Sequence, residues 1–343
     1  MKMKIFLAVF LFCGILLFSL SSMELISEYD LEDFDIFQPF KMIVIKNEIF
    51  IMDKGNYKIF KLSKGNKVVN FGKIGQGPKE YLTPISFYFD NHCIRVHDVG
   101  GQIVKFDLNG KWIESIKNEI IGNLDIKLRI LNKDKYISQK MNFLKKGTLN
   151  ISYYYKNKNL IITILNMNFS LLKPDVENNN ALNSLYTKSF TIGHNHCFFI
   201  RNNTKFKIIS FDMTKQEFQP WIEDKDYKLI KYSKIEKLKY QNEKRETLKK
   251  VPFPYRKVLK RLKLPEFKPP IMYLIADESD YLYVVTNKVN NNSENLARIY
   301  DSNAKYLKSI WIPKYEIIQV CCNKIYIIVE ENDTYKLKIY KYN

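Results

Sequence analysis

The sequence predicts an all-β fold, namely a six-bladed β-propeller with a short helical insertion before the fifth blade. Three observations lead to this prediction: a composition that favours strands, a hairpin pattern that recurs along the chain, and a repeat length typical of propeller blades. The chain has 23 Tyr and 23 Phe but only 12 Gly and 11 Pro. Because aromatic residues are enriched in strands, this composition favours β-structure.

A β-hairpin pattern recurs five times along the chain. Each copy has an apolar alternating strand, a polar turn with Asp or Asn, and a second strand that ends near Phe or Tyr. One strand precedes each hairpin and another follows it, so a unit has four short strands, as a propeller blade does. The hairpins are Ile49–Lys61, Ile94–Asp107, Phe198–Asp212, Leu282–Asp301 and Ile325–Tyr340.

A sixth unit, from about residue 124 to 172, lacks the Asp-containing turn of the others. With the insertion set aside, about 285 residues over six units is close to the ~40–45 residues of a propeller blade. Glu24–Phe37 is predicted to add a strand to the last blade, because closure of the ring removes exposed sheet edges. The predicted strands of the sixth unit are Lys127–Leu131, Lys135–Gln139, Ile151–Tyr155 and Leu160–Asn166.

Residues 1–22 are predicted to be a secretory signal peptide. Lys2 and Lys4 form a basic start, Ile5–Leu20 is almost wholly apolar, and a small-x-small cleavage pattern ends at Ser21. The alternative is an uncleaved membrane anchor, because the apolar run is long for a signal peptide. The propeller itself, 23–343, is expected to be exported to the periplasm, the cell surface or the medium, as a monomer without a membrane span.

The insertion spans about 233 to 270 and is predicted to be helical. Ser233 and Glu236 have the spacing of a capping box, and the helix that they open can continue to Lys250. Pro252 and Pro254 then break it. An apolar face at helical spacing predicts a second helix, with Tyr255, Val258, Leu259 and Leu262 on that face.

The insertion is also strongly basic. From Lys225 to Lys268 there are 16 Lys or Arg against 5 Asp or Glu, a balance of +11. Such a charge attracts polyanions, so we expect a partner that is an acidic protein, a glycan or another anionic component of the cell envelope. Nucleic acid is not expected for an exported protein, and the alternative is a merely solvated helical face. The densest basic residues are Lys249, Lys250, Arg256, Lys257, Lys260, Arg261 and Lys263.

A glycine-rich stretch, Phe71–Pro84 (FGKIGQGPKEYLTP), lies between two of the repeats. Glycine tolerates positive φ and proline fixes φ, so the stretch predicts a sharply folded connection between blades. A phosphate-binding role is disfavoured, because no GK[ST] ending and no helix start follow the last glycine. We expect Glu80 to accept hydrogen bonds from exposed backbone N–H groups and Tyr81 to pack between blades.

This stretch resembles the interblade signature of six-bladed β-propellers related to NHL-repeat proteins, which are common among exported bacterial proteins. That signature is G-x-x-G-x-G-P-G-E-F followed shortly by Pro. Lys79 stands where the family often has Gly, and Tyr81 stands where it has Phe. The residues that match the signature or stand at its positions are Gly72, Gly75, Gly77, Pro78, Glu80, Tyr81 and Pro84.

No catalytic, cofactor-binding or metal-binding residue is predicted. His194 and His196 can face one side of a strand, but they and His92 lie in turn-like surroundings and are interpreted as surface or turn residues. Three side chains follow the first hairpin strand of successive repeats and are expected to hold their own turns by Asx-type hydrogen bonds. These are Asp53, Asp98 and Asn202.

Four cysteines follow the predicted signal peptide, and all four are interpreted as core residues rather than disulfide partners. Cys93 and Cys197 fall at matching points of two strand patterns, where a small buried hydrophobe fits. Cys321 and Cys322 are adjacent, so they cannot easily bond to each other.

The sequence therefore predicts a non-catalytic scaffold that binds a protein, a glycan or another ligand. Resemblance to NHL-type propellers also implies an alternative, a metal-dependent lyase or lactonase/esterase with Ca²⁺ or Zn²⁺ in the central channel. The fold alone does not decide between them, because propellers host both kinds of protein.

Overall fold

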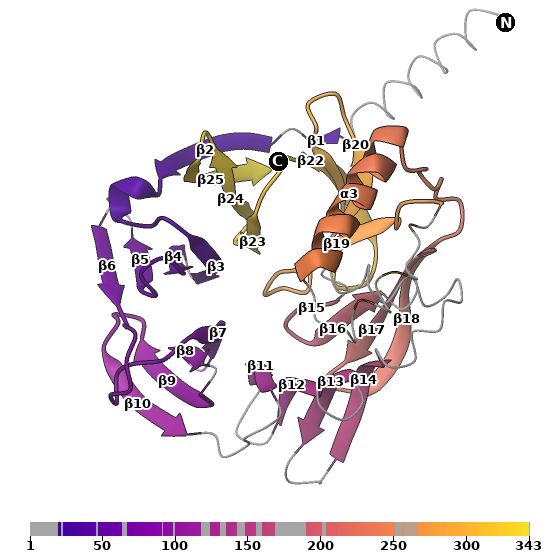
Figure 1. The fold of residues 1–343 in the computed structure, drawn as a ribbon. Coiled ribbons are helices and arrows are strands. Elements are labelled where there is room, and N and C mark those ends of the chain that lie inside the picture. The colour runs from indigo at the N-terminus through magenta and orange to yellow at the C-terminus, as the bar shows by residue number, and fades with distance from the viewer. Residues whose placement is uncertain are drawn as a thin grey trace, which may run out of the picture. The chain divides into compact units, whose positions relative to one another are not determined.

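The computed structural model describes the chain in sixteen stretches, and those residues form six β-sheets (Figure 1). The chain divides into two compact units. Unit 1 comprises Met1–Ile26, Lys173–Lys314 and Tyr340–Asn343, and unit 2 comprises Ser27–Leu172 and Tyr315–Ile339. The described residues are 20–21, 23–45, 47–63, 67–90, 92–98, 100–117, 124–130, 135–142, 148–155, 160–168, 190–200, 204–250, 256, 260, 264 and 266–342.

Unit 2 holds three four-stranded antiparallel sheets in which each strand pairs with the next along the chain. The first consists of β3 (Pro39–Ile45), β4 (Glu48–Asp53), β5 (Ile59–Ser63) and β6 (Lys67–Phe71). The second consists of β7 (Pro84–Asp90), β8 (Cys93–Asp98), β9 (Gln102–Asp107) and β10 (Trp112–Lys117). The third consists of β11 (Leu124–Ile130), β12 (Lys135–Asn142), β13 (Thr148–Tyr155) and β14 (Leu160–Asn168), so the sixth predicted unit does form four strands.

A further sheet, mainly in unit 2, joins the two ends of the described chain. Its strand order is β2-β25-β24-β23, so the second strand of the chain lies beside the last one (Figure 1). The backbone N–H of Leu31 continues this pairing and donates to Tyr335 O at 2.9 Å. The prediction of a strand within Glu24–Phe37 that completes the last sheet is confirmed. The four strands are β2 (Met23–Asp30), β25 (Thr334–Tyr342), β24 (Lys324–Glu331) and β23 (Ile317–Cys321).

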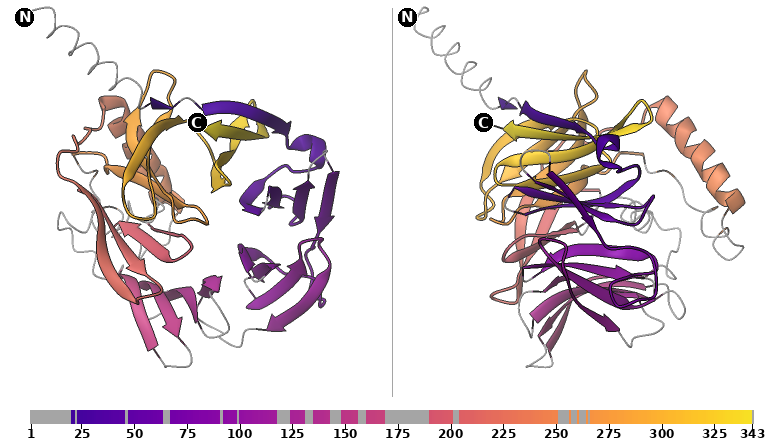
Figure 2. Two further views of the ribbon diagram at one scale, coloured as in Figure 1. Left: turned by 180° about the vertical axis from the view of Figure 1, so that it is seen from behind. Right: turned by 90° about the vertical axis from the view of Figure 1, so that its left-hand side faces the viewer.

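Unit 1 holds two sheets and helix α3 (Lys234–Lys250). One sheet consists of β15 (Phe190–Ile192), β16 (His196–Ile200), β17 (Phe206–Asp212) and β18 (Glu217–Asp224). The other consists of β19 (Ile271–Ala276), β20 (Leu282–Val289), β21 (Asn295–Tyr300) and β22 (Tyr306–Ile312), and β1 (Leu20–Ser21) adds to β22 in parallel. Figure 2 shows α3 standing apart from these strands.

Strand β4 is buried on both faces, which differs from the alternation that the sequence suggested. In β4, Phe50 and Met52 belong to the apolar cluster shared with the β7–β10 sheet. Ile49 and Ile51, on the opposite face, belong to the cluster shared with β24. Because successive side chains point to opposite faces, a strand packed on both sides must be apolar at every position.

Three of the four cysteines are buried as predicted, namely Cys93, Cys197 and Cys321. Burial raises the pKa of the Cys197 thiol to about 12, as expected for an inert core residue. The prediction is wrong for Cys322, which is exposed. Cys322 follows the last residue of β23 and has a φ of 53°, so the chain turns back there and its side chain leaves the core.

Several predictions fall on residues outside the described part of the chain. Of the predicted signal peptide, only Leu20 and Ser21 are described. The apolar face of the second predicted helix, Tyr255, Val258, Leu259 and Leu262, also lies outside the described residues. Within the part of the chain that the structure describes, no helix is long and apolar enough to cross a membrane.

Candidate functional site

The connection between β6 and β7 folds back on the carboxylate of Glu80. Glu80 Oε2 accepts the N–H of Gly77 at 2.9 Å, and its Oε1 lies 2.7 Å from Lys73 Nζ. The ammonium of Lys73 and the N–H of Gly77 both lower the pKa of Glu80. A Cβ at Gly75 would lie 1.9 Å from Glu80 Oε2, so only glycine leaves room for this carboxylate. Glu80 therefore holds the turn together.

Tyr81, the next residue, anchors the same connection in the core. Its side chain is fully buried and packs with residues of both flanking sheets, Phe50 and Phe87 among them. Its hydroxyl donates to Tyr57 O at 2.6 Å. Gly72, with a φ of +76°, lies against this ring, where a Cβ would be 2.5 Å from the hydroxyl oxygen. The glycines thus make space for the Glu80 carboxylate, which holds the turn, and for the Tyr81 ring, which packs with both flanking sheets.

Two hairpin aspartates of unit 2 accept hydrogen bonds from the residues that precede the first strand of their own sheet. Asp53 accepts the N–H of Gln38 at 2.5 Å, and Asp98 accepts the N–H of Leu82 at 3.0 Å. Each also accepts an N–H from its own turn, as the sequence predicts. Both aspartates are buried. The third member of this set, Asn202, lies outside the described residues.

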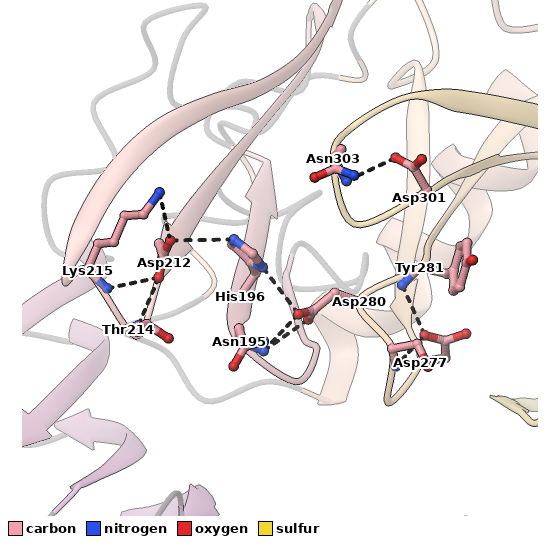
Figure 3. Close-up of polar contacts among 11 residues, drawn as sticks. Asn195, His196, Asp212, Thr214, Lys215, Asp277, Asp280, Tyr281, Asp301 and Asn303 are labelled. Carbon is pink, nitrogen blue, oxygen red and sulfur yellow. Dashed lines mark hydrogen bonds and ion pairs between the residues drawn. The ribbon is translucent and has the colours of Figure 1, made fainter.

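In unit 1 a different junction is made by a histidine and an aspartate that are far apart in sequence (Figure 3). His196, the first residue of β16, places its Nδ1 3.3 Å from Asp280 Oδ2. The same oxygen accepts the N–H of Asn195 at 2.9 Å. Burial alone would raise the pKa of Asp280, but the hydrogen bonds from His196 and Asn195 outweigh it and the net direction is downward. Gly193 lies close to this carboxylate, because a Cβ at this position would be only 2.1 Å from Asp280 Oδ1.

A second carboxylate faces the other side of the imidazole. His196 Nε2 lies 3.8 Å from Asp212 Oδ2, and Asp212 is the cross-strand partner of His196 on β17. The other oxygen of Asp212 accepts the N–H groups of Thr214 and Lys215 (Figure 3). The ring of Trp221 packs against the imidazole at 4.8 Å between centroids. The prediction that His196 is a surface or turn residue is wrong, because these contacts enclose it between two sheets.

Two neighbouring aspartates in Figure 3 hold only their own turns. Asp277 accepts the N–H of Tyr281 at 3.0 Å, and Asp301 accepts the N–H of Asn303 at 2.9 Å. Burial raises the pKa of Asp277, and the charge of Asp280 adds to that effect although the backbone N–H groups oppose it. These carboxylates do not converge on the imidazole, so the cluster works as a set of structural links.

The other histidines divide between turns and core. His92 and His194 are exposed residues of turns, as the sequence predicts. His97 is buried on β8, where its Nε2 lies 2.8 Å from the hydroxyl of Tyr88. Within the described residues, no group of three or more His, Cys, Asp or Glu side chains is placed to hold a metal ion.

The helical insertion begins with the predicted capping box. Its two ends pair in an antiparallel bridge between Lys231 and Phe267, which we call the neck. Ser233 N donates to Glu236 Oε2 at 2.8 Å, and Glu236 N donates back to Ser233 Oγ at 3.2 Å. The two arms of the insertion pair where Lys268 N donates to Ile230 O at 2.7 Å. Lys268 Nζ also reaches Glu236 Oε1 at 2.6 Å. The start of α3 is therefore fixed by hydrogen bonds and an ion pair.

Helix α3 half-buries a stripe that alternates charged residues with Tyr and Leu. Four half-buried residues recur at i, i+4 on this inner stripe: Glu236, Tyr240, Lys244 and Leu248. Lys244 Nζ donates to Lys260 O at 3.1 Å, and burial lowers the pKa of Lys244.

The opposite face of α3, its outer face, exposes apolar side chains. Ile235 is 79% exposed and Leu238 is 60% exposed. Their spacing of three residues puts them side by side on a helix. The outer face continues with three polar residues at helical spacing, Asn242, Arg245 and Lys249, all exposed. Sequence reasoning missed this face, because the apolar residues of α3 fall on two sides and the sequence does not tell which side is buried.

The structure places only part of the predicted basic surface. Lys249 is exposed and pairs with Glu246 at 2.6 Å, whereas Arg256 donates to Lys249 O at 3.2 Å, beyond the last turn of α3. Lys260 is exposed, and Lys250 ends the helix. The remaining three residues, Lys257, Arg261 and Lys263, lie outside the described part of the chain.

Sheets of four antiparallel strands that follow one another along the chain define the class: the protein is a β-propeller. Residues 19–198 match the model of a family described as a 6-bladed beta-propeller, DUF5128. This match covers more than half of the chain, so the chain belongs to that family. The predicted fold class is thereby confirmed, whereas the relation to NHL repeats stays a prediction.

Solved structures of low sequence identity are similar to this chain. A protein of Bacteroides fragilis that is named as exported is 14% identical, with a TM-score of 0.52 over 94% of this chain and 95% of that chain. Virginiamycin B lyase from Staphylococcus aureus is 12% identical, with a TM-score of 0.45 over 93% of this chain and 99% of that chain. None of the curated protein sequences matches this chain. At such identities the similarity concerns the fold alone.

Proposed function

We propose that this chain is an exported, non-catalytic propeller that uses the outer face of α3 to bind an acidic segment of another protein. The observation that carries the proposal is the orientation of α3. The helix half-buries Glu236 and Lys244 on its inner stripe, beside Tyr240 and Leu248, and it leaves Ile235 and Leu238 in solvent. A helix that only had to fold would place its apolar side chains inward.

The exposed aliphatic pair can supply part of the free energy of binding. Burying an exposed aliphatic side chain such as Ile235 or Leu238 is worth about 1.5–3 kcal/mol. The cations that border the pair, including Lys234 and Arg245, are exposed and attract a negatively charged partner over long range. The two aliphatic side chains would then contribute affinity for the partner, and the exposed cations would raise the association rate and the specificity.

An acidic protein segment fits this face better than a glycan or a lipid surface does. Two neighbouring aliphatic side chains require apolar side chains opposite them, which a polysaccharide offers only in part. A membrane-bound helix needs a broad apolar face along its length. In α3 the outer face becomes polar from Asn242 onward, and Glu243 and Glu246 interrupt its positive charge.

Two hydrogen-bonded connections, one within each unit, support this proposal. At the two junctions described above, the carboxylates of Glu80 and Asp280 are occupied by backbone N–H groups and by a cationic or imidazole partner. Side chains that are held by several such partners are less free to rearrange around a substrate. These junctions therefore favour presentation of a surface over catalysis.

A selection from displayed random peptides tests the proposal. The wild-type chain and an Ile235→Ser/Leu238→Ser variant are each used as bait. The matched control carries the same chemical change at two exposed residues elsewhere in unit 1, Val289→Ser/Leu307→Ser. We expect wild type and control to enrich the same peptides, rich in Asp or Glu around apolar residues, and the α3 variant to enrich none of them.

Two outcomes would overturn the proposal. If all three baits enrich the same peptides, the outer face of α3 is not the binding surface. If elemental analysis of the purified chain finds stoichiometric Ca²⁺ or Zn²⁺, and its removal abolishes hydrolysis or elimination of a substrate, the protein is an enzyme rather than a scaffold.

A further inference from the structure

The adjacent cysteines of unit 2 lie with their sulfur atoms close together. Cys321 Sγ and Cys322 Sγ are 3.2 Å apart. Cys321 ends β23 and pairs with Lys324 on β24, so the intervening turn contains only Cys322 and Asn323. Both turn residues have positive φ, 53° and 58°, as in a type I′ hairpin turn.

This turn explains how neighbouring cysteines come to share one side of the chain. In an extended strand, successive side chains point to opposite faces, so adjacent thiols are kept apart. The left-handed conformation of Cys322 removes that separation. Residues other than glycine and asparagine seldom adopt it, and it costs about 1–2 kcal/mol for an ordinary L-residue. In the corresponding turns of two other sheets, Asn47 and His92 stand at the position of Asn323 and also have positive φ, 68° and 66°.

The two thiols differ sharply in accessibility. Cys321 is 3% exposed and belongs to an apolar cluster with Ile49 and Tyr326. Cys322 is exposed to solvent. Burial raises the pKa of the Tyr326 hydroxyl to about 12, and the two nearby thiols contribute to this shift. A dissolved reagent can therefore reach the sulfur of Cys322 directly, and the sulfur of Cys321 lies behind it in contact.

We propose that Cys321 and Cys322 form a reversible dithiol–disulfide site that is oxidised by small disulfides of the glutathione type. The Cys322 thiolate attacks one sulfur of the disulfide RS–SR, which forms Cys322–S–S–R and releases RS⁻. The Cys321 thiolate then attacks the Cys322 sulfur, which forms the Cys321–Cys322 bond and releases the second RS⁻. The two thiol protons pass to the two released thiolates, so the protein loses two electrons and RS–SR gains them.

The proposed bond is suited to reversible use. Consecutive Cα atoms are about 3.8 Å apart, closer than the ~4.4–6.8 Å of ordinary disulfides. The strain that this spacing imposes makes a disulfide easier to reduce, which is typical of labile or regulatory bonds rather than structural ones. The site lies in unit 2 and does not depend on α3, so it is independent of the proposed binding function.

Mass spectrometry of the intact, full-length chain tests the proposal. The reduced protein is incubated with oxidised glutathione, its remaining thiols are alkylated, and the protein is digested with trypsin. The peptide Tyr315–Lys324 contains both cysteines and no other. We expect this peptide to lose two hydrogens, to take up no alkyl group, and to regain both thiols after mild reduction. Cys93 and Cys197, which are buried, should stay reduced and serve as internal controls.

Two variants separate the roles of the sulfurs. Cys321→Ser should accumulate a stable glutathione adduct on Cys322, because no second thiol resolves it. Cys322→Ser should leave Cys321 unmodified in the folded protein, because that thiol is buried. The proposal is overturned if the wild-type peptide keeps glutathione, if it links to a second chain through Cys322, or if both thiols remain reduced. The wild-type measurement decides the question even if a variant does not fold.

Discussion

The connection Gly72–Pro84 and helix α3 use polar and apolar side chains in opposite ways. In the connection, Tyr81 is fully buried and Glu80 is tied to backbone and lysine, so the sheets use both side chains. In α3, Ile235 and Leu238 are exposed, and Glu236 is turned inward. The first region is explained by folding alone. The exposed aliphatic pair of α3 is not explained by folding, and we therefore place the binding surface on α3.

The largest effect should come from truncating the anchor of the connection. Tyr81→Ala removes a fully buried aromatic ring and leaves Tyr57 O without its donor. We expect a loss of about 3–5 kcal/mol in the free energy of unfolding, measured by urea denaturation. Tyr81→Phe, which keeps the ring, should lose only about 1 kcal/mol. A loss below 1 kcal/mol for Tyr81→Ala would show that the connection does not stabilise the sheets.

The junction in unit 1 should respond less strongly but depend on pH. Asp280→Asn removes the charge that faces His196, and we expect a loss of about 1–3 kcal/mol at pH 7. Because the pKa of Asp280 is lowered in the folded chain, its contribution is present above the unfolded value of about 3.9 and is lost as pH falls through the folded value.

Urea midpoints measured at pH 7 and at about pH 3 check this prediction. Wild type should lose more stability between the two pH values than Asp280→Asn does, so the difference between the two proteins narrows in acid. Parallel losses in both proteins would mean that the charge of Asp280 does not contribute to folding.

A smaller effect is expected at the start of α3. Ser233→Ala removes the hydroxyl that accepts the N–H of Glu236, which should destabilise the helix by about 0.5–2 kcal/mol. Amide hydrogen exchange across 234–250 should therefore accelerate, while the amides of β19 and β20 should exchange at the wild-type rate. Ser233→Thr keeps the hydroxyl and should preserve slow exchange. Equal exchange in Ser233→Ala and wild type would show that the neck alone holds the helix.

Repeats and glycines made most of the fold predictable. Hairpin spacing located the strands, and the positions of Gly72, Gly75 and Gly77 marked the connection, because these positions have little room for a side chain. The link between His196 and Asp280 was not predictable, because its partners lie 84 residues apart and pair only after two sheets come together. The outer face of α3 was missed for a related reason. A helix with apolar residues on two sides has no unique buried face until its neighbours are placed.

The affinity of a selected acidic peptide for three forms of the protein tests the central claim most directly. The forms are wild type, Ile235→Ser/Leu238→Ser, and the control Val289→Ser/Leu307→Ser. Loss of two aliphatic contacts predicts at least a tenfold rise in Kd for the α3 variant, no change for the control, and weaker wild-type binding as salt is added. All three proteins should unfold within about 0.5 kcal/mol of one another, because the substituted side chains are exposed. Equal Kd values for wild type and the α3 variant would contradict the claim.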